Sequence, residues 1–117
     1  MVVTGSVDKT IRGFDTRAGP AGRPLFQLEG HSYAVRRVKC SPHAENIVAS
    51  CSYDFTTKIW DISRPHGLQQ LQSFDDHTEF VIGMDWNLHT PGELIDCAWD
   101  ETLIVRRLPP PPAPMKP

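Results

Sequence analysis

The sequence lacks the features that mark several protein classes. It contains only 3 cysteines in 117 residues, an odd number that argues against a disulfide framework and fits a reducing compartment. The formal net charge of −2 offers no basic stripe of the kind that nucleic acid requires. No apolar run approaches the length of a membrane span, and the first residues are typical of neither a signal peptide nor a transit segment. What remains is the composition of a folded globular protein, with 39% hydrophobic and 22% charged residues.

Motifs that carry chemistry are equally scarce. There is no glycine-rich phosphate loop and no pair of catalytic carboxylates. Cys40 and His43 lie three residues apart, but the chain has no second pair at zinc-site spacing. Cys51 and Cys97 are better explained as buried strand thiols. We therefore expect no metal, no cofactor and no enzymatic activity.

The chain does contain an internal repeat with a fixed period of 46 residues. The segment from Ser50 to Asp61 aligns without a gap with two others, Thr4–Asp15 and Asp96–Arg107. Aspartate recurs in one register and threonine in another, at Asp8, Asp54 and Asp100 and at Thr10, Thr56 and Thr102. Gly30-His31 aligns with Asp76-His77, and Trp60-Asp61 closes the middle copy. A period near 40–45 residues with Gly-His and Trp-Asp marks is typical of a four-stranded propeller blade.

Strand patterning agrees with this interpretation and predicts an all-β fold without helices. We expect ten strands, at Val2–Ser6, Thr10–Asp15, Leu25–Leu28, Ala34–Cys40, Ile47–Ser52, Thr56–Ile62, Leu68–Phe74, Val81–Asn87, Leu94–Trp99 and Thr102–Leu108. In an up-and-down sheet alternate loops lie at the same end. The loop with His31 and the turn with Asp54 should therefore share one face, and the loop Ser63–Gly67 should lie on the other.

The predicted organisation is a β-propeller fragment of about two and a half blades. Residues 2–29 form a partial blade, 30–75 a complete blade and 76–108 a last, incomplete blade. Residues 109–117 are a proline-rich tail that we expect to be extended and disordered, and the Gly/Pro-rich stretch Ala18–Pro24 should be a surface loop. Because propellers close with 4–8 blades, we expect the chain to be the C-terminal piece of a longer protein.

One cluster invites two interpretations. His31, Ser50 and Asp54 are the residue types of a nucleophilic triad. However, a triad is not expected to recur with the repeat. The pattern resembles WD-repeat proteins, and the resemblance implies a structural tetrad of His31, Ser50, Asp54 and Trp60. Its repeat equivalents are Thr4, Asp8 and Phe14 in the first copy and His77, Asp96, Asp100 and Arg106 in the last.

Two points about the tetrads follow from the residue types. Either Ser50 or Ser52 could supply the hydroxyl, and we favour Ser50. Phe14 and Arg106 are not expected to reproduce the indole hydrogen bond, so the flanking blades should be less rigid than the middle one.

Longer strings narrow the resemblance. The segments Gly30–His43, Ala49–Thr56, His77–Phe80 and Asp96–Thr102 are similar to the last blades of the receptors for the type-2 peroxisomal targeting signal. The resemblance implies a cytoplasmic and peroxisomal protein that binds the N-terminal signal peptide of matrix enzymes and then docks with a co-receptor and the import machinery. Such signals carry a basic residue near the start and apolar residues displayed on a helix.

The expected rim of the loop face suits such a ligand. Aromatic and acidic side chains should converge there, and they make a surface for an amphipathic, cationic helix. The candidates are Tyr33, Tyr53, Glu79, Trp99 and Glu101, with Asp76 as a further counter-charge. The alternative is a generic WD-repeat scaffold subunit of a multiprotein complex, and a weaker one is an enzyme that uses the His31 cluster.

Overall fold

The computed structural model describes residues 2–15 and 25–108, which form ten strands and no helix. The predicted loop Ala18–Pro24 and the proline-rich tail 109–117 lie outside these residues. The strands are β1 (Val2–Gly5), β2 (Thr10–Phe14), β3 (Phe26–Glu29), β4 (Val35–Cys40), β5 (Ile47–Ser52), β6 (Thr57–Asp61), β7 (Gln70–Phe74), β8 (Val81–Trp86), β9 (Glu93–Ala98) and β10 (Leu103–Arg107). Each predicted strand matches one of these to within two residues at either end.

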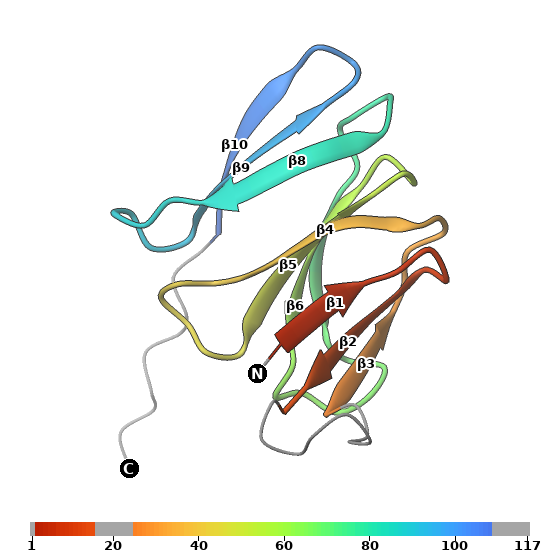
Figure 1. The fold of residues 1–117 in the computed structure, drawn as a ribbon. Coiled ribbons are helices and arrows are strands. Elements are labelled where there is room, and N and C mark those ends of the chain that lie inside the picture. Colours follow the sequence, from red (N-terminus) through yellow and green to blue (C-terminus); the bar gives the residue numbers. More distant parts are fainter. Residues whose placement is uncertain (1, 16–24, 109–117) are drawn as a thin grey trace.

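The strands form three antiparallel meanders that fan out side by side (Figure 1). Their orders are β1-β2-β3, β4-β5-β6-β7 and β10-β9-β8, so each strand pairs with its neighbour in sequence. The repeat is structural as well as sequential, because β4 and β8 carry a bulge at the same repeat position, between Val35 and Arg37 and between Val81 and Gly83. This arrangement confirms the prediction of an all-β, partial propeller.

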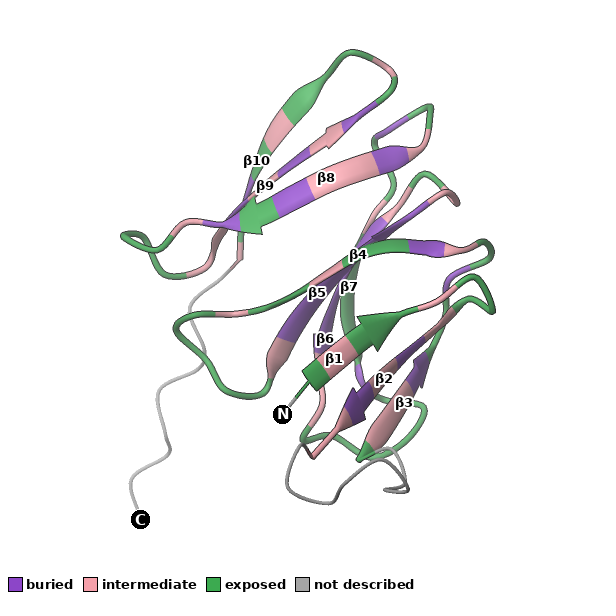
Figure 2. Cartoon of the chain, in the orientation of Figure 1, coloured by how far each residue is buried: buried purple, intermediate pink, exposed green. Residues whose placement is uncertain are grey.

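The two central strands of the middle sheet, β5 and β6, are buried on both faces. Strand β5 is almost wholly buried (Figure 2). Alternate β5 residues point to opposite sides of the sheet. Val48 joins a core cluster with Ile11 and Leu28 of the first sheet. Ala49 and Cys51 join a second cluster with the last sheet, whose members there are Val81, Met84, Trp86, Leu94 and Ala98.

A tight turn with an unusual backbone recurs at the repeat spacing. Lys9, Phe55 and Glu101 have φ values of 75°, 73° and 66°, in the left-handed region that non-glycine residues seldom adopt. In the middle turn, the Asp54 carboxylate accepts hydrogen bonds from both the backbone N–H and the hydroxyl of Thr56, at 3.0 and 2.5 Å. The recurring Asp and Thr therefore hold a conformation that the intervening residue would not choose alone.

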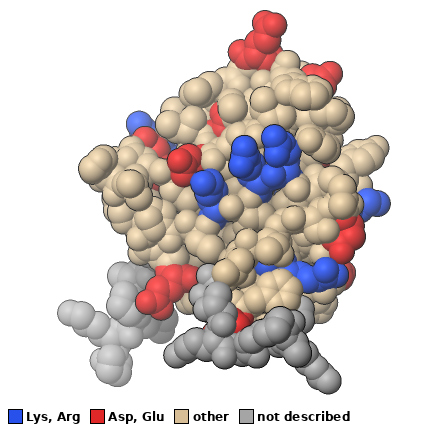
Figure 3. Space-filling model, viewed as in Figure 1, with Lys and Arg blue, Asp and Glu red and all other residues tan. Residues whose placement is uncertain are grey.

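The basic run of the sequence lies on β4, an edge strand of the middle sheet. Arg36, Arg37 and Lys39 of β4 are all exposed. Figure 3 shows Lys and Arg side chains gathered near the middle of the face where Figure 1 draws β4. In the described part of the chain, no helix has the length and apolarity to cross a membrane, and no three His, Cys, Asp or Glu side chains are grouped to hold a metal ion.

Candidate functional site

The structure brings together the four residues of the predicted middle tetrad. His31 Nδ1 lies 2.8 Å from Asp54 Oδ2, and His31 Nε2 lies 2.6 Å from Ser50 Oγ. The Trp60 indole N–H donates to the same Ser50 oxygen at 2.8 Å. Ser52 has a different role, because its hydroxyl contacts the carbonyl oxygens of residues 33 and 34. Ser50 is thus the hydroxyl in the tetrad.

The tetrad ties a loop to a turn. The Asp54 carboxylate also accepts from the backbone N–H of Ser32 at 2.9 Å, so it bridges the His31 loop and its own turn. Burial acts to raise the pKa of Asp54, but hydrogen bonds from His31, Thr56 and Ser32 outweigh it and hold this pKa well below its ordinary value. The carboxylate is therefore ionised at neutral pH, and the network fixes the shape of this edge of the blade.

The last blade contains a charged version of the same network. His77 lies 3.0 Å from Asp100 through Nδ1 and 2.7 Å from Asp96 through Nε2. Arg106 Nε donates to the other oxygen of Asp96 at 3.0 Å. Arg106 was not expected to reproduce the indole hydrogen bond, but its guanidinium replaces the indole as donor, because Asp96 replaces the serine as acceptor. The last tetrad is complete, with ionic partners.

A third substitution accompanies these two. Gly30 in the middle blade is required by close approach, because a Cβ there would lie 2.9 Å from the Trp60 ring. The equivalent residue in the last blade is Asp76, whose carboxylate lies 2.7 Å from Arg106 Nη1. Asp76, expected as a counter-charge for a ligand, is thus paired within the blade. The guanidinium of Arg106 is smaller than the indole ring of Trp60, so the Asp76 side chain fits beside it.

The first blade shows no such network among its described residues. Asp8 forms an ion pair of 3.2 Å with Arg12. Thr4 Oγ1 contacts the Arg12 carbonyl oxygen at 3.5 Å, and Phe14 is half-buried. A hydrogen bond from the Thr10 hydroxyl, more than the Arg12 charge, lowers the pKa of Asp8. The Asp8 turn is therefore held locally and is not tied to a histidine loop within residues 2–15 and 25–108.

These differences predict a ranking for aspartate substitutions. Asp54→Ala should destabilise the chain by about 1–3 kcal/mol, because it removes the carboxylate that accepts from the buried His31 imidazole and from the Ser32 N–H. Asp8→Ala should have a smaller effect, since its partners are exposed. Urea unfolding of the two variants measures both. Equal shifts in the unfolding midpoint would contradict the tetrad's role in stability.

Aromatic side chains gather where the middle and last blades meet. The Phe80 ring is central: its centroid lies 4.6 Å from that of Tyr53, 5.9 Å from Phe55 and 5.2 Å from Trp99. We call these four residues the rim aromatic cluster. All four lie in the loops and turns that the tetrads connect. There, the Tyr53 and Trp99 N–H groups donate to the carbonyls of residues 34 and 80. Trp99 remains 59% exposed, so the cluster is presented to solvent.

The other predicted binding residues have different settings. Glu79 and Glu101 are exposed, and neither forms an ion pair with another residue in the described part of the chain. Tyr33 is 61% exposed but makes no ring contact with the cluster within that part. Sequence reasoning did not single out Phe80 or Phe55. The sequence nevertheless indicates them, because each lies close to a predicted candidate: Phe80 is next to Glu79, and Phe55 is two residues after Tyr53.

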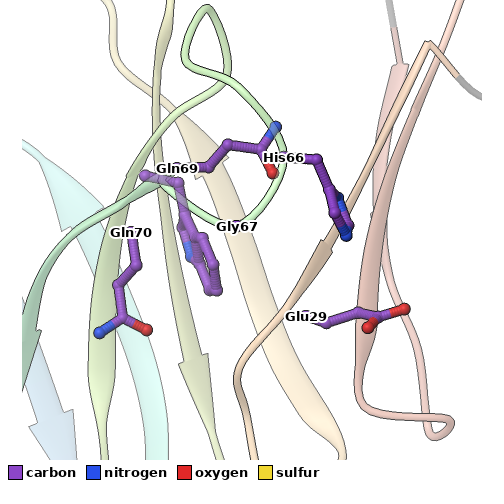
Figure 4. Close-up of a pocket in the computed structure, with 6 residues that line it drawn as sticks. Glu29, His66, Gly67, Gln69 and Gln70 are labelled. Atoms are coloured by element: carbon purple, nitrogen blue, oxygen red, sulfur yellow. The ribbon is translucent and has the colours of Figure 1, made fainter.

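A separate polar pocket lies away from this cluster. It measures about 470 Å³ and is located between the end of β3 and the segment leading into β7 (Figure 4). Its lining residues are Glu29, Trp60, His66, Gly67, Gln69 and Gln70. None of the predicted peptide-binding residues contributes to it. The rim aromatic cluster is therefore a surface site and not the mouth of this pocket.

Comparisons with known proteins agree with the repeat and with the resemblance. Residues 22–61 match the family model "WD domain, G-beta repeat". The chain is 49% identical to the peroxisomal targeting signal 2 receptor of Mus musculus, over 69% of this chain and 25% of the relative. It is 38% identical to the receptor of the same name from Saccharomyces cerevisiae, over 90% of this chain and 36% of that relative. Peroxisome biogenesis protein 7 of Arabidopsis thaliana is 41% identical, over 70% of this chain and 25% of that relative.

The chain thus covers about a quarter of the length of the mouse relative and somewhat more than a third of the yeast one. The likeness to these receptors extends well beyond the 40 or so residues that one blade needs. Together with the three antiparallel meanders, it identifies the chain as a WD-repeat protein that resembles the peroxisomal targeting signal 2 receptors.

Proposed function

We propose that this chain forms part of a receptor that binds the type-2 targeting signal of peroxisomal matrix proteins, and that the rim aromatic cluster belongs to its cargo site. The observation that carries the proposal is the exposed cluster itself, built by two adjacent blades around Phe80. The relatives are named as receptors for peroxisomal targeting signal 2, and that name supplies the ligand.

The chemistry of the rim fits a cationic, amphipathic peptide. The four aromatic rings offer apolar area that is fixed by contacts between the rings themselves, so little side-chain entropy remains to be lost on binding. Glu79 and Glu101 flank Phe80 and Trp99 in sequence and are exposed. They can meet basic residues of a helix whose apolar face packs on the rings.

The His31 network supports a structural role and not catalysis. Ser50 has no exposed surface, and its oxygen is already engaged by the His31 ring and the Trp60 indole. A nucleophile must reach its substrate, which this hydroxyl cannot do without opening the blade. We infer that the chain is not an enzyme and that the tetrads serve to position the rim.

The remaining parts of the proposal follow from the receptor role. A receptor of this kind works in the cytoplasm and at the peroxisome, and passes its cargo to a co-receptor and the docking machinery. The exposed basic side chains of β4, at Arg36, Arg37 and Lys39, are not members of the rim aromatic cluster, and their charge does not suit a cationic peptide.

Peptide binding tests the proposal in a hybrid receptor, in which residues 2–108 of this chain replace the matching repeats of the full-length mouse relative. Trp99→Ala should weaken binding of a fluorescent type-2 signal peptide roughly 30-fold, the effect of losing a central aromatic anchor. Glu79→Lys should also weaken it, by charge repulsion. Fluorescence anisotropy gives the affinities.

Arg64→Ala is the matched control, because Arg64 is exposed and lies in the loop that follows β6, away from the rim. It should leave the affinity unchanged. Loss of binding in Arg64→Ala with normal binding in Trp99→Ala would place the site on the other face. No binding by the unsubstituted hybrid, even with co-receptor, would favour a generic scaffold instead.

A further inference from the structure

The polar network of the last blade surrounds a buried histidine with carboxylates on both sides. The His77 side chain has no exposed surface, and its two ring nitrogens face Asp96 Oδ1 and Asp100 Oδ2. The other acceptor positions of these carboxylates are occupied by donors. Asp96 Oδ2 accepts from Arg106, and Asp100 accepts from the N–H groups of residues 78 and 102.

These contacts determine where the protons lie. An ionised carboxylate can only accept hydrogen bonds, so both nitrogens of His77 must donate, and only the imidazolium form does so. His31 differs, because its Nε2 faces the Ser50 hydroxyl. That hydroxyl accepts from the Trp60 indole and can donate its own proton to the ring. The last blade therefore holds a charged ring at this repeat position, whereas the hydroxyl that faces His31 can donate or accept and does not require a second ring proton.

We propose that His77 is a proton switch: as an imidazolium it ties the loop 76–80 to the turn 98–102, and loss of its proton releases that tie. The tie includes the hydrogen bond from the Thr78 N–H to Asp100, which completes the same network. Phe80 lies in the loop and Trp99 in the turn. A consequence for peptide binding follows if the rim is the cargo site, and this part rests on the proposed function.

The two carboxylates around His77 favour its protonated form, and the positive charge of Arg106 in the same network opposes it. Strand β9 and its turn contribute Asp96 and Asp100, and β10 contributes Arg106, whose charge is partly balanced by Asp76. Cys51 of the middle blade interacts with Asp96 and not with His77 directly, and it stays neutral because burial raises the pKa of its thiol to about 12. Burial acts to lower the pKa of His77, but hydrogen bonds and attraction from the two carboxylates raise it above the ordinary 6.5.

The sign of the effect follows from this raised value. A histidine whose pKa is higher in the folded state stabilises that state fully below its ordinary pKa of 6.5. The stabilisation is lost as the pH rises through the raised pKa. The last blade should therefore be tied at neutral and mildly acidic pH and loosened at alkaline pH.

Nitrogen-edited NMR of the histidine rings in the 117-residue chain tests the switch directly. At about pH 6.5, both ring nitrogens of His77 should give imidazolium signals. His77 should lose its proton only at higher pH. A neutral His77 ring at this pH would overturn the proposal, whatever the variants do.

Exchanging the two networks provides the second test. The triple variant Asp76→Gly, Asp96→Ser, Arg106→Trp gives the last blade the neutral set of the middle blade. From about pH 6 to about pH 9, the melting temperature of the unsubstituted chain should fall more than that of the variant, because only the unsubstituted chain loses the stabilisation that the protonated His77 supplies. Equal falls in both proteins would show that His77 is not the linked group.

Peptide binding separates this proposal from the proposed function. In the hybrid receptor, affinity for the signal peptide should decrease from about pH 6.5 to about pH 8.5, and the triple variant should lose this dependence. Binding that does not depend on pH would overturn the link to the rim. Absence of binding at every pH would overturn the receptor role, while the ring signals of His77 still decide the switch.

Discussion

Arg106→Ala is expected to destabilise the chain by about 3–5 kcal/mol, among the largest effects of any single substitution. Arg106 is 5% exposed and Asp96 has no exposed surface. Removal of the guanidinium leaves the Asp96 carboxylate buried with only the His77 ring as a charged partner. It also removes the cation–π contact of Arg106 with the Phe74 ring, 4.6 Å from its centroid. Urea unfolding at neutral pH measures the loss.

A second substitution shows whether the loss comes from the stranded charge. Asp96→Ser added to Arg106→Ala removes the carboxylate as well, and should recover part of the lost stability although two interactions are now absent. Arg107→Ala is the control, because Arg107 is adjacent but its side chain is 80% exposed and pairs with Glu93 only at 3.4 Å. It should change stability by less than about 1 kcal/mol. Similar losses for Arg106→Ala and Arg107→Ala would contradict the account.

The strands and the tetrad positions could be predicted because their signals are local and repeated. The Asp-x-Thr turn marks the same hairpin in each copy, and its hydrogen bonds recur at Asp8, Asp54 and Asp100. The predicted strands end near these turns for that reason. The largest error is at β7, predicted from Leu68 and observed from Gln70, where the pairing with β6 has an irregularity between residues 59 and 60.

The ionic tetrad was missed because each residue was compared with its own equivalent and not with its new neighbours. Asp96 in place of serine and Arg106 in place of tryptophan are each unfavourable alone. Together with Asp76 in place of Gly30, they form a connected set. Three coordinated changes at tetrad-related positions of one repeat were visible in the sequence, and they indicate exchange of a neutral network for a charged one.

The rim aromatic cluster was missed in part for a different reason. Phe80 occupies the repeat position of Ala34, so a comparison of the copies assigns no shared role to an aromatic side chain there. Its partners Tyr53 and Phe55 belong to the neighbouring blade, and contacts between blades depend on how two sheets pack. Periodicity within one strand does not contain that information.

Trp60→Ala should destabilise the chain by about 3–5 kcal/mol, through a cavity between the first and middle sheets. Trp60 is 2% exposed and packs in the cluster with Ile11, Leu28, Val35 and Val48. The change also removes the donor that orients the Ser50 hydroxyl. Thermal and urea unfolding followed by circular dichroism measure the total.

Trp60→Phe divides this effect into its two parts, because phenylalanine keeps most of the apolar volume and lacks the indole N–H. It should destabilise by about 1–3 kcal/mol, the range for a buried hydrogen-bonding group left without its partner. Phe14→Ala, at the equivalent position of the first blade, is the matched control: Phe14 is half-buried and makes no tetrad contact in the described residues. It should destabilise less than Trp60→Ala. If Trp60→Phe were neutral, the indole hydrogen bond would contribute nothing to stability, and the tetrad would act through packing alone.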